Sequence, residues 1–145
     1  MGESEALPIN NKWRSAVNRR PLSCFVIVHN EAQRIQRCLE SIAGWVDQLV
    51  ILDSGSSDGT LEICKRYTPE VYSTDWPGFG VQRNRALSKC RHDWVLNIDA
   101  DEEVSTALRA EIDEVLSRPS LDCNLIKIPW HTQLFGKRLR FGRYA

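Results

Sequence analysis

Continuous apolar runs alternate with helical stripes along most of this chain. The runs have the composition of strands buried on both faces, and they lie at residues 22–28, 48–52, 71–73 and 94–98. A fifth strand is predicted at residues 124–129. Helices are predicted between and after the first four runs, at residues 35–44, 60–67, 81–90 and from 104 until Pro119 stops the last one. Four such alternations predict right-handed crossovers and therefore an α/β fold, a mostly parallel sheet flanked by helices on both faces.

Composition sets broad bounds on this domain. The chain has 145 residues, of which 42% are hydrophobic and 26% charged, as expected for one globular domain with a real core. Its 19 basic and 19 acidic residues cancel, so the overall charge predicts no nucleic-acid partner. We expect a flexible polar arm at residues 1–20, a folded domain at 21–130, and the start of a further region at 131–145.

The cysteines and the N-terminal residues indicate the cellular compartment of the protein. The five cysteines are widely spaced and form no Cys-x-x-Cys pair, which favours buried, reduced thiols in a cytosolic protein. The first twenty residues lack the apolar core of a signal peptide, and no apolar run is long enough to span a bilayer. These features predict a cytoplasmic protein.

The fourth strand runs directly into four carboxylates, Asp99, Asp101, Glu102 and Glu103. Neighbouring carboxylates repel one another, so the segment needs either a cation or a solvated setting. One interpretation is an acidic turn in which Glu102 and Glu103 precede a helix. The other is that Asp99 and Asp101, on one side of an extended strand, hold a divalent cation together with phosphate oxygens. A calcium loop is excluded, since it needs Gly and Glu where the chain has Val104 and Ala110.

Ligands of open α/β sheets bind at the carboxyl ends of the strands. The first strand is followed there by His29, Asn30 and Glu31, and the second by Asp53. The chain has no phosphate-binding G-x-x-x-x-G-K-[ST] loop and no glycine-rich dinucleotide fingerprint, so a nicotinamide-dependent oxidoreductase is not expected.

Four motifs occur in a characteristic order: FVIVHNE, ILDSGSSDGT, GFGVQRNRAL and WVLNIDADE. In this order and spacing the chain resembles the family 2 glycosyltransferases of the GT-A fold, and more narrowly their lipopolysaccharide-core glucosyltransferase branch, in which a D-W-P-G-F-G-x-Q-x-N-x-A-L segment recurs. The resemblance covers residues 22–143.

The resemblance implies a role for each matched residue. Asp53 would hydrogen-bond the nucleotide base, and Asp58 would order its own loop. Asp99 would lie beside the ribose and the metal, and Asp101 would be the ligand of a divalent Mn²⁺ or Mg²⁺. The remaining nucleotide-site residues would line the base pocket or face the diphosphate and ribose: Val28, His29, Asn30, Glu31, Gln82, Arg83 and Asn84. Val28 and His29 depart from the Thr or Pro, and the Lys or Tyr, that the family often has at these positions.

The resemblance further implies an inverting, metal-assisted transfer of a hexose, with glucose from UDP-glucose as donor and lipopolysaccharide core or a related glycan as acceptor. Inversion needs a base that takes the proton of the attacking hydroxyl. No residue matches the family's base, and chemistry alone offers only Asp75 and His131. Family domains continue well past this length, so the chain is expected to be truncated. The alternative is a catalytically inactive, truncated nucleotide-binding protein.

The segment from Ile126 to Ala145 is basic and aromatic. It holds five Lys or Arg, no acidic residue and four aromatic side chains. One interpretation is peripheral contact with an anionic membrane, at the inner face of the cytoplasmic membrane, or with a phosphorylated glycolipid. The alternative is that Trp130 and Phe135 belong to a core that the chain lacks.

Overall fold

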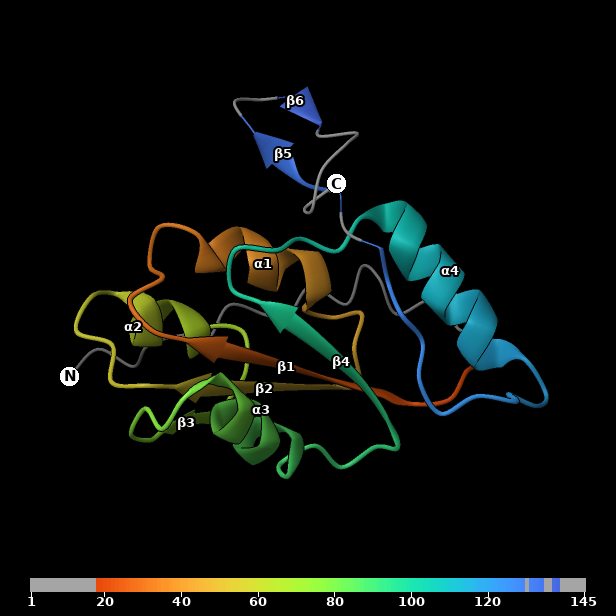
Figure 1. Ribbon diagram of the computed structural model, residues 1–145, viewed down its shortest axis with the longest axis horizontal. Coiled ribbons are helices and arrows are strands. Elements are labelled where there is room, and N and C mark those ends of the chain that lie inside the picture. Colours follow the sequence, from red (N-terminus) through yellow and green to blue (C-terminus); the bar gives the residue numbers. More distant parts are fainter. Residues whose placement is uncertain (1–17, 130, 135–136, 139–145) are drawn as a thin grey trace.

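A four-stranded parallel sheet forms the centre of the computed structural model, which describes residues 18–129, 131–134 and 137–138 (Figure 1). Its strands are β1 (Leu22–Val28), β2 (Gln48–Asp53), β3 (Val71–Ser73) and β4 (Trp94–Asp99), in the order β3-β2-β1-β4. All three pairings are parallel. The predicted α/β class and the first four strands are confirmed.

Helices cover the two faces of the sheet unequally. The connections contain α1 (Ile35–Ile42), α2 (Thr60–Cys64) and α3 (Phe79–Leu87), and α4 (Thr106–Ser117) follows β4. A large apolar cluster joins one face of the sheet to α1, α2 and α4, whereas α3 alone packs on the other, through Ala86 (Figure 1). Because β1 is buried from end to end, its side chains alternate between these two cores.

Strand register brings distant residues to one edge of the sheet. Val28 pairs with Asp53 of β2, and Ile27 pairs with Asp99 of β4. The carboxyl ends of β1, β2 and β4 therefore lie level with one another, as a parallel sheet requires. The loops that leave these strands start side by side.

Several predicted boundaries were wrong. Helix α2 is shorter than predicted and α3 begins at Phe79, two residues early. Helix α4 begins only after Ser105, whose hydroxyl accepts a hydrogen bond from the Leu108 N–H and caps it. Val104 lies before this helix and is buried, so its place in the apolar stripe reflects burial and not helical structure.

The predicted fifth strand at residues 124–129 was also wrong. These residues are irregular and mostly exposed, because no strand among the described residues lies beside them to accept their backbone hydrogen bonds. A short hairpin of β5 (Gln133–Leu134) and β6 (Lys137–Arg138) follows, which the sequence pattern did not predict.

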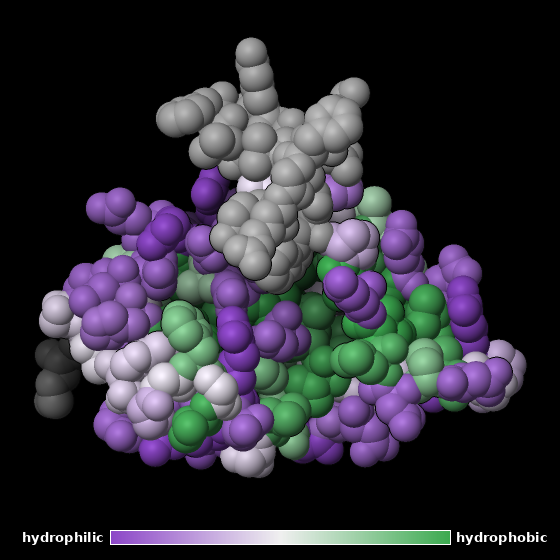
Figure 2. Space-filling view, in the orientation of Figure 1, coloured by the Kyte–Doolittle hydropathy of each residue, from purple (hydrophilic) through white to green (hydrophobic). Residues whose placement is uncertain are grey.

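The face that carries β4 and α4 is rich in apolar surface (Figure 2). Leu116 is the only residue of α4 that is fully buried, while Leu108 and Ile112 are partly buried against the core. The described residues therefore leave much of this helix uncovered.

The folded unit starts before Pro21. Within the segment predicted to be a flexible arm, Arg19 forms ion pairs with Asp47 and Asp113, at 2.9 and 2.6 Å. The Arg20 guanidinium donates to the carbonyls of Leu116, Arg118 and Pro119 at the end of α4. The last residues of the predicted arm thus hold α4 to the sheet.

Some predictions fall outside the described residues. They concern residues 1–17 of the arm and half of the basic, aromatic segment, including Trp130 and Phe135. Among the residues that are described, no helix has the length and apolar character needed to cross a membrane.

Candidate functional site

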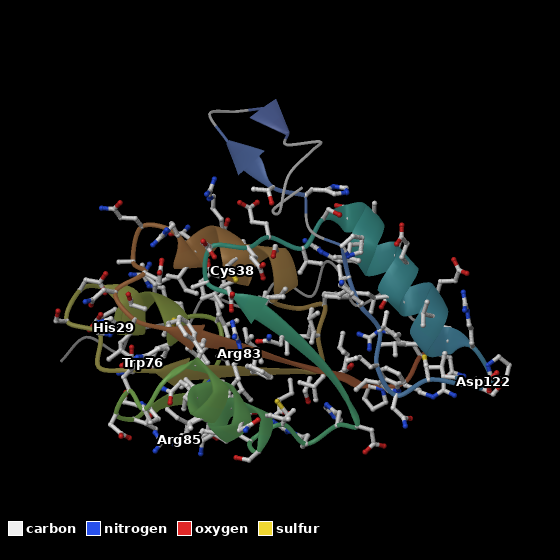
Figure 3. The ribbon with its side chains drawn as sticks, in the orientation of Figure 1. His29, Cys38, Trp76, Arg83, Arg85 and Asp122 are labelled. Carbon is white, nitrogen blue, oxygen red and sulfur yellow. The ribbon has the colours of Figure 1, made fainter. Side chains whose placement is uncertain are left out.

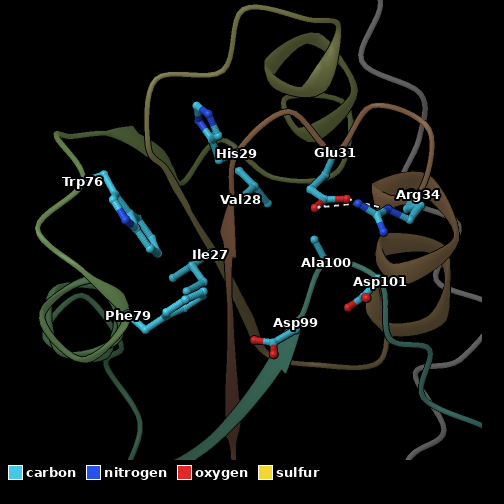
Figure 4. Close-up of a pocket in the computed structure, with 10 residues that line it drawn as sticks. All are labelled: Ile27, Val28, His29, Glu31, Arg34, Trp76, Phe79, Asp99, Ala100 and Asp101. Carbon is cyan, nitrogen blue, oxygen red and sulfur yellow. Dashed lines mark hydrogen bonds and ion pairs between the residues drawn. The ribbon is translucent and has the colours of Figure 1, made fainter. Parts of the chain in front are cut away.

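A pocket of about 460 Å³ opens at the carboxyl edge of the sheet (Figure 4). Its lining comes from the ends of β1 and β4, the start of α1 and the β3–α3 segment. The lining residues are Ile27, Val28, His29, Glu31, Arg34, Trp76, Phe79, Asp99, Ala100 and Asp101. Five predicted site residues are thus brought together: Val28, His29, Glu31, Asp99 and Asp101. The others, Asn30, Asp53, Gln82, Arg83 and Asn84, are not part of the lining.

Two loops beside the pocket are fastened to each other. Asn30 adopts a left-handed conformation with φ of 53°. Its N–H donates to Ser56 Oγ, and its side-chain oxygen accepts from the Ser57 N–H, at 2.9 and 2.8 Å. The Glu31 N–H donates to Thr60 Oγ1 at 2.8 Å. Asn30, predicted to shape the nucleotide pocket, joins the β1–α1 loop to the β2–α2 loop.

Asp58 strengthens the same connection. Its carboxylate accepts from the N–H groups of Ala32 and Thr60, at 3.1 and 3.0 Å. The hydrogen bond from the Thr60 hydroxyl is the main cause that lowers the pKa of Asp58, and the bonds from these N–H groups add to it. The prediction that Asp58 orders its own loop is confirmed.

Asp53 is fully buried at the end of β2. Its carboxylate accepts from the N–H groups of Gly55 and Ser56 and from the Ser56 hydroxyl. Gly55 has φ of +87°, which a glycine adopts without strain and which lets the chain wrap around the carboxylate. Asp53 therefore shapes this loop, and its predicted contact with a nucleotide base stays a prediction.

Arg83 connects α3 to the end of β4. Its guanidinium donates to both Asp99 oxygens, at 2.8 and 3.2 Å, and lies 5.4 Å from the centre of the Phe79 ring. The Arg83 Nε is buried and has no hydrogen-bond partner among the described residues. A buried donor without a partner is costly, so this edge of the site suits an anionic ligand.

The neighbours of Arg83 face in different directions. Gln82 is fully buried, and its amide donates to Ser54 Oγ and Thr74 Oγ1, at 2.8 and 3.0 Å. Asn84 is exposed. Gln82 thus ties α3 to the loops after β2 and β3, a structural role that its predicted position near the diphosphate did not include.

The acidic turn is organised by Glu102. Its carboxylate accepts from the Asp99 N–H at 2.8 Å, and burial, reinforced by Asp99 and Asp101, raises its pKa. Glu102 precedes α4, as the acidic-turn interpretation expected, but it lies four residues before the helix begins at Thr106.

The donor set for a divalent metal is small. Asp99 and Asp101 line one pocket, but among the described residues no three His, Cys, Asp or Glu side chains form a group able to hold a metal. Two carboxylates fit a hard cation whose other ligands are phosphate oxygens and water.

Neither candidate base lies in the pocket lining. Asp75 is held by Arg85 at 2.8 Å, and this hydrogen bond and charge lower the pKa of Asp75, which makes it a weaker base. His131 is exposed. The structure supports neither residue as the base.

The family model for glycosyl transferase family 2 matches residues 23–142. The chain belongs to this family. An uncharacterized glycosyltransferase of Rickettsia felis is 40% identical over 101 residues, 70% of this chain and 36% of that protein. A lipopolysaccharide core biosynthesis glycosyltransferase, LpsC of Rhizobium meliloti, is 36% identical over 70% of this chain and 39% of its own length.

A solved structure shares the fold of this family 2 chain. Glucosyl-3-phosphoglycerate synthase of Mycobacterium tuberculosis, in complex with Mn²⁺ and UDP-glucose, matches with a TM-score of 0.51 and 32% identity, over 57% of this chain and 33% of that one. The fold is therefore GT-A. The chain spans about a third of the length of these relatives.

Five lining residues of this family 2 chain were not predicted, and three of them, Arg34, Trp76 and Phe79, have charged or aromatic side chains; the other two are Ile27 and Ala100. The Arg34 guanidinium donates two hydrogen bonds to the Glu31 carboxylate, at 2.8 and 3.0 Å, so this ion pair holds the Arg34 side chain at the pocket. Trp76 and Phe79 pack edge to face, with ring centres 4.8 Å apart. The signal for both rings was the exposed D-W-P-G-F-G turn itself, since large aromatic side chains in a glycine-rich turn have little core to join.

Proposed function

We propose that this chain forms the donor-binding part of an inverting glycosyltransferase that moves a hexose from a UDP-hexose, with glucose as the sugar, to lipopolysaccharide core or a related glycan. The observation that carries the proposal is the meeting of Arg83, Asp99 and Asp101 at one edge of the pocket. LpsC supports the acceptor class, and the synthase bound to UDP-glucose supports the donor.

The residues of the chain have separate tasks in this proposal. Arg83, with its unpartnered Nε, binds the diphosphate, and Asp99 orients Arg83 and meets the ribose. Asp99 and Asp101 would hold Mn²⁺ or Mg²⁺, which when bound stabilises the departing nucleoside diphosphate. Val28 and His29 form the wall on which the nucleoside rests. The base that deprotonates the acceptor remains unassigned, so we expect this chain alone to transfer sugar weakly or not at all.

Calorimetric titration with UDP, with and without Mn²⁺, tests the proposal. UDP should bind, and the metal should tighten binding. Asp101→Ala should remove the metal effect because it removes a ligand. Asp93→Ala is the matched control, since Asp93 is an exposed aspartate at the other end of the same strand. Equal UDP affinity in chelator and in Mn²⁺, or an Asp101 variant that responds to metal like the wild type, would show the metal role to be wrong.

A further inference from the structure

The aromatic pair Trp76 and Phe79 has no role in the mechanism described so far. Both rings are large, apolar and well exposed, at 47% and 62%, yet both line the pocket. Trp76, His29 and Arg83 gather at one end of the sheet, far from Asp122 at the other (Figure 3). Exposing two such rings is unfavourable in water unless something covers them in use.

The pocket has two chemically different sides (Figure 4). One side is made of aromatic and apolar groups: His29, Trp76, Phe79 and Ile27. The other carries the Glu31–Arg34 ion pair and the carboxylate of Asp101, with Asp99 between the two sides. A ligand with a flat, apolar-faced end and a phosphate end that is accompanied by a cation would fit only one way round.

The position of Trp76 is fixed by its neighbours. Phe79 packs against it edge to face, and the Arg83 guanidinium lies over the Phe79 ring. Gly78, between the two rings, has φ of +108°, a conformation that favours glycine. Gln82, one turn into α3, is bonded to the loops on both sides. The Trp76 ring therefore belongs to a segment that hydrogen bonds hold in place on both sides, at Thr74 and at Gln82.

We propose that Trp76 is a nucleobase-binding residue of the donor site, an aromatic platform that stacks on the base opposite His29. This inference rests on the proposed function, since it assigns one part of the same site. Phe79 is a positioning residue, because it acts by holding Trp76 and the Arg83 guanidinium.

A sugar ring is the less suitable occupant of this side. Hexose hydroxyls need several hydrogen-bonding groups, and the aromatic side offers only the His29 ring and the Trp76 indole N–H, whereas the ionic side carries carboxylates and a guanidinium. A nucleobase presents a flat π-face, and stacking on an aromatic side chain contributes to its affinity. With the base against Trp76, the diphosphate extends toward Arg83 and Asp99.

Binding measurements with two half-ligands test the assignment. Uridine probes the aromatic side, and inorganic pyrophosphate with Mg²⁺ probes the ionic side. Trp76→Ala and Trp76→Leu should bind uridine and UDP about 5- to 150-fold more weakly, as loss of one base–aromatic stack predicts. Both variants should bind pyrophosphate like the wild type, which also shows that they fold. Trp76→Phe should recover most of the uridine affinity.

Tyr72→Ala is the matched control. Tyr72 is a half-exposed aromatic residue of β3 that lies outside the pocket lining, with Lys89 Nζ 4.0 Å from its ring centre, and its loss should leave uridine binding unchanged. Wild-type uridine affinity in Trp76→Ala would overturn the inference and leave the proposed function standing. A loss of affinity in Trp76→Ala that affected UDP-glucose but not uridine or UDP would also overturn the inference, because it would indicate that the sugar contacts Trp76. Failure of the wild type to bind UDP with metal would overturn the proposed function itself, and this inference with it.

Discussion

Replacing Arg19 should destabilise the domain far more than replacing a surface arginine. The Arg19 side chain is only 9% exposed, and its guanidinium pairs with Asp113 at 2.6 Å and Asp47 at 2.9 Å, where the carboxylates are 17% and 34% exposed. It also donates to the Trp45 carbonyl at 2.8 Å. In Arg19→Met the aliphatic part is kept and the charge is lost, so two partly buried carboxylates remain without their cation.

The size of the expected loss of stability depends on the hydrogen bonds that Asp47 and Asp113 keep in the variant. Removing one partner of a buried ion pair typically costs about 3–5 kcal/mol. Here Asp47 still accepts from the Leu22 N–H, and Asp113 from the Trp45 indole N–H. Asp47 is also partly solvated, so we expect a loss of about 2–4 kcal/mol in the free energy of unfolding, somewhat below the fully buried case.

Urea unfolding followed by tryptophan fluorescence measures this loss. Arg118→Ala is the control, because Arg118 pairs with Glu114 at 3.5 Å with both side chains more than half exposed. A pair of this kind is worth about 0.3–0.5 kcal/mol. If Arg19→Met unfolded at the same urea concentration as Arg118→Ala, the claim that Arg19 belongs to the folded unit would be refuted.

The same contact sets a pH dependence. Burial raises the pKa of Asp47, but the Leu22 N–H and the charge of Arg19 outweigh it, and the net pKa is lowered. A carboxylate with a lowered folded-state pKa stabilises the protein at neutral pH, and this contribution is lost as the pH falls through the folded-state value. Arg19→Met should therefore reduce the stability difference between neutral and acidic pH.

Two further predictions concern buried groups. Gln82→Leu should lower the free energy of unfolding by about 1–3 kcal/mol, because Ser54 and Thr74 lose a buried hydrogen-bond partner. Asn84→Ala, at an exposed position of the same helix, should change the free energy of unfolding little, and equal effects of the two variants in chemical denaturation would contradict the prediction. At pH 8, a thiol reagent should label the exposed Cys123 quickly and the buried Cys38 slowly, with the labelled residue identified by mass spectrometry. Burial, reinforced by the charge of Glu102, raises the pKa of Cys38 to about 12 and leaves it a neutral thiol, so rapid labelling of Cys38 would be inconsistent with the structure.

The strands were predictable because their signal is strong and local. A run such as Leu22–Val28 is apolar at almost every position, which only a strand buried on both faces requires, and all seven residues are buried. The parallel order then followed from the alternation with helices. The segment at 124–129 is less apolar, with Leu125, Ile126 and Ile128 as its aliphatic residues, and a strand also needs a neighbour, which sequence periodicity does not supply.

The pocket was predictable only in part. Parallel strands place their carboxyl ends together, so His29, Glu31, Asp99 and Asp101 could be expected at one edge. What each carboxylate bonds to depends on loop geometry. Asp53 is enclosed by the chain two and three residues beyond it, and such short-range turns are set by a single left-handed glycine. The hydrogen bonds of Gln82 join α3 to two separate loops, and no spacing rule indicates them.

Charge in and around the pocket argues for a cation entering with the donor. Three carboxylates, those of Glu31, Asp99 and Asp101, face two guanidinium groups, those of Arg34 and Arg83, which leaves one negative charge in excess. A nucleoside diphosphate would add more negative charge to this region, and like charges at short range repel by several kcal/mol when they are poorly solvated. Each guanidinium is also paired with a carboxylate that offsets its charge, so the two arginines alone do not neutralise a diphosphate. A divalent cation held by Asp99 and Asp101 would offset part of this negative charge. Metal dependence of UDP binding is therefore a more discriminating test of the site than UDP affinity alone.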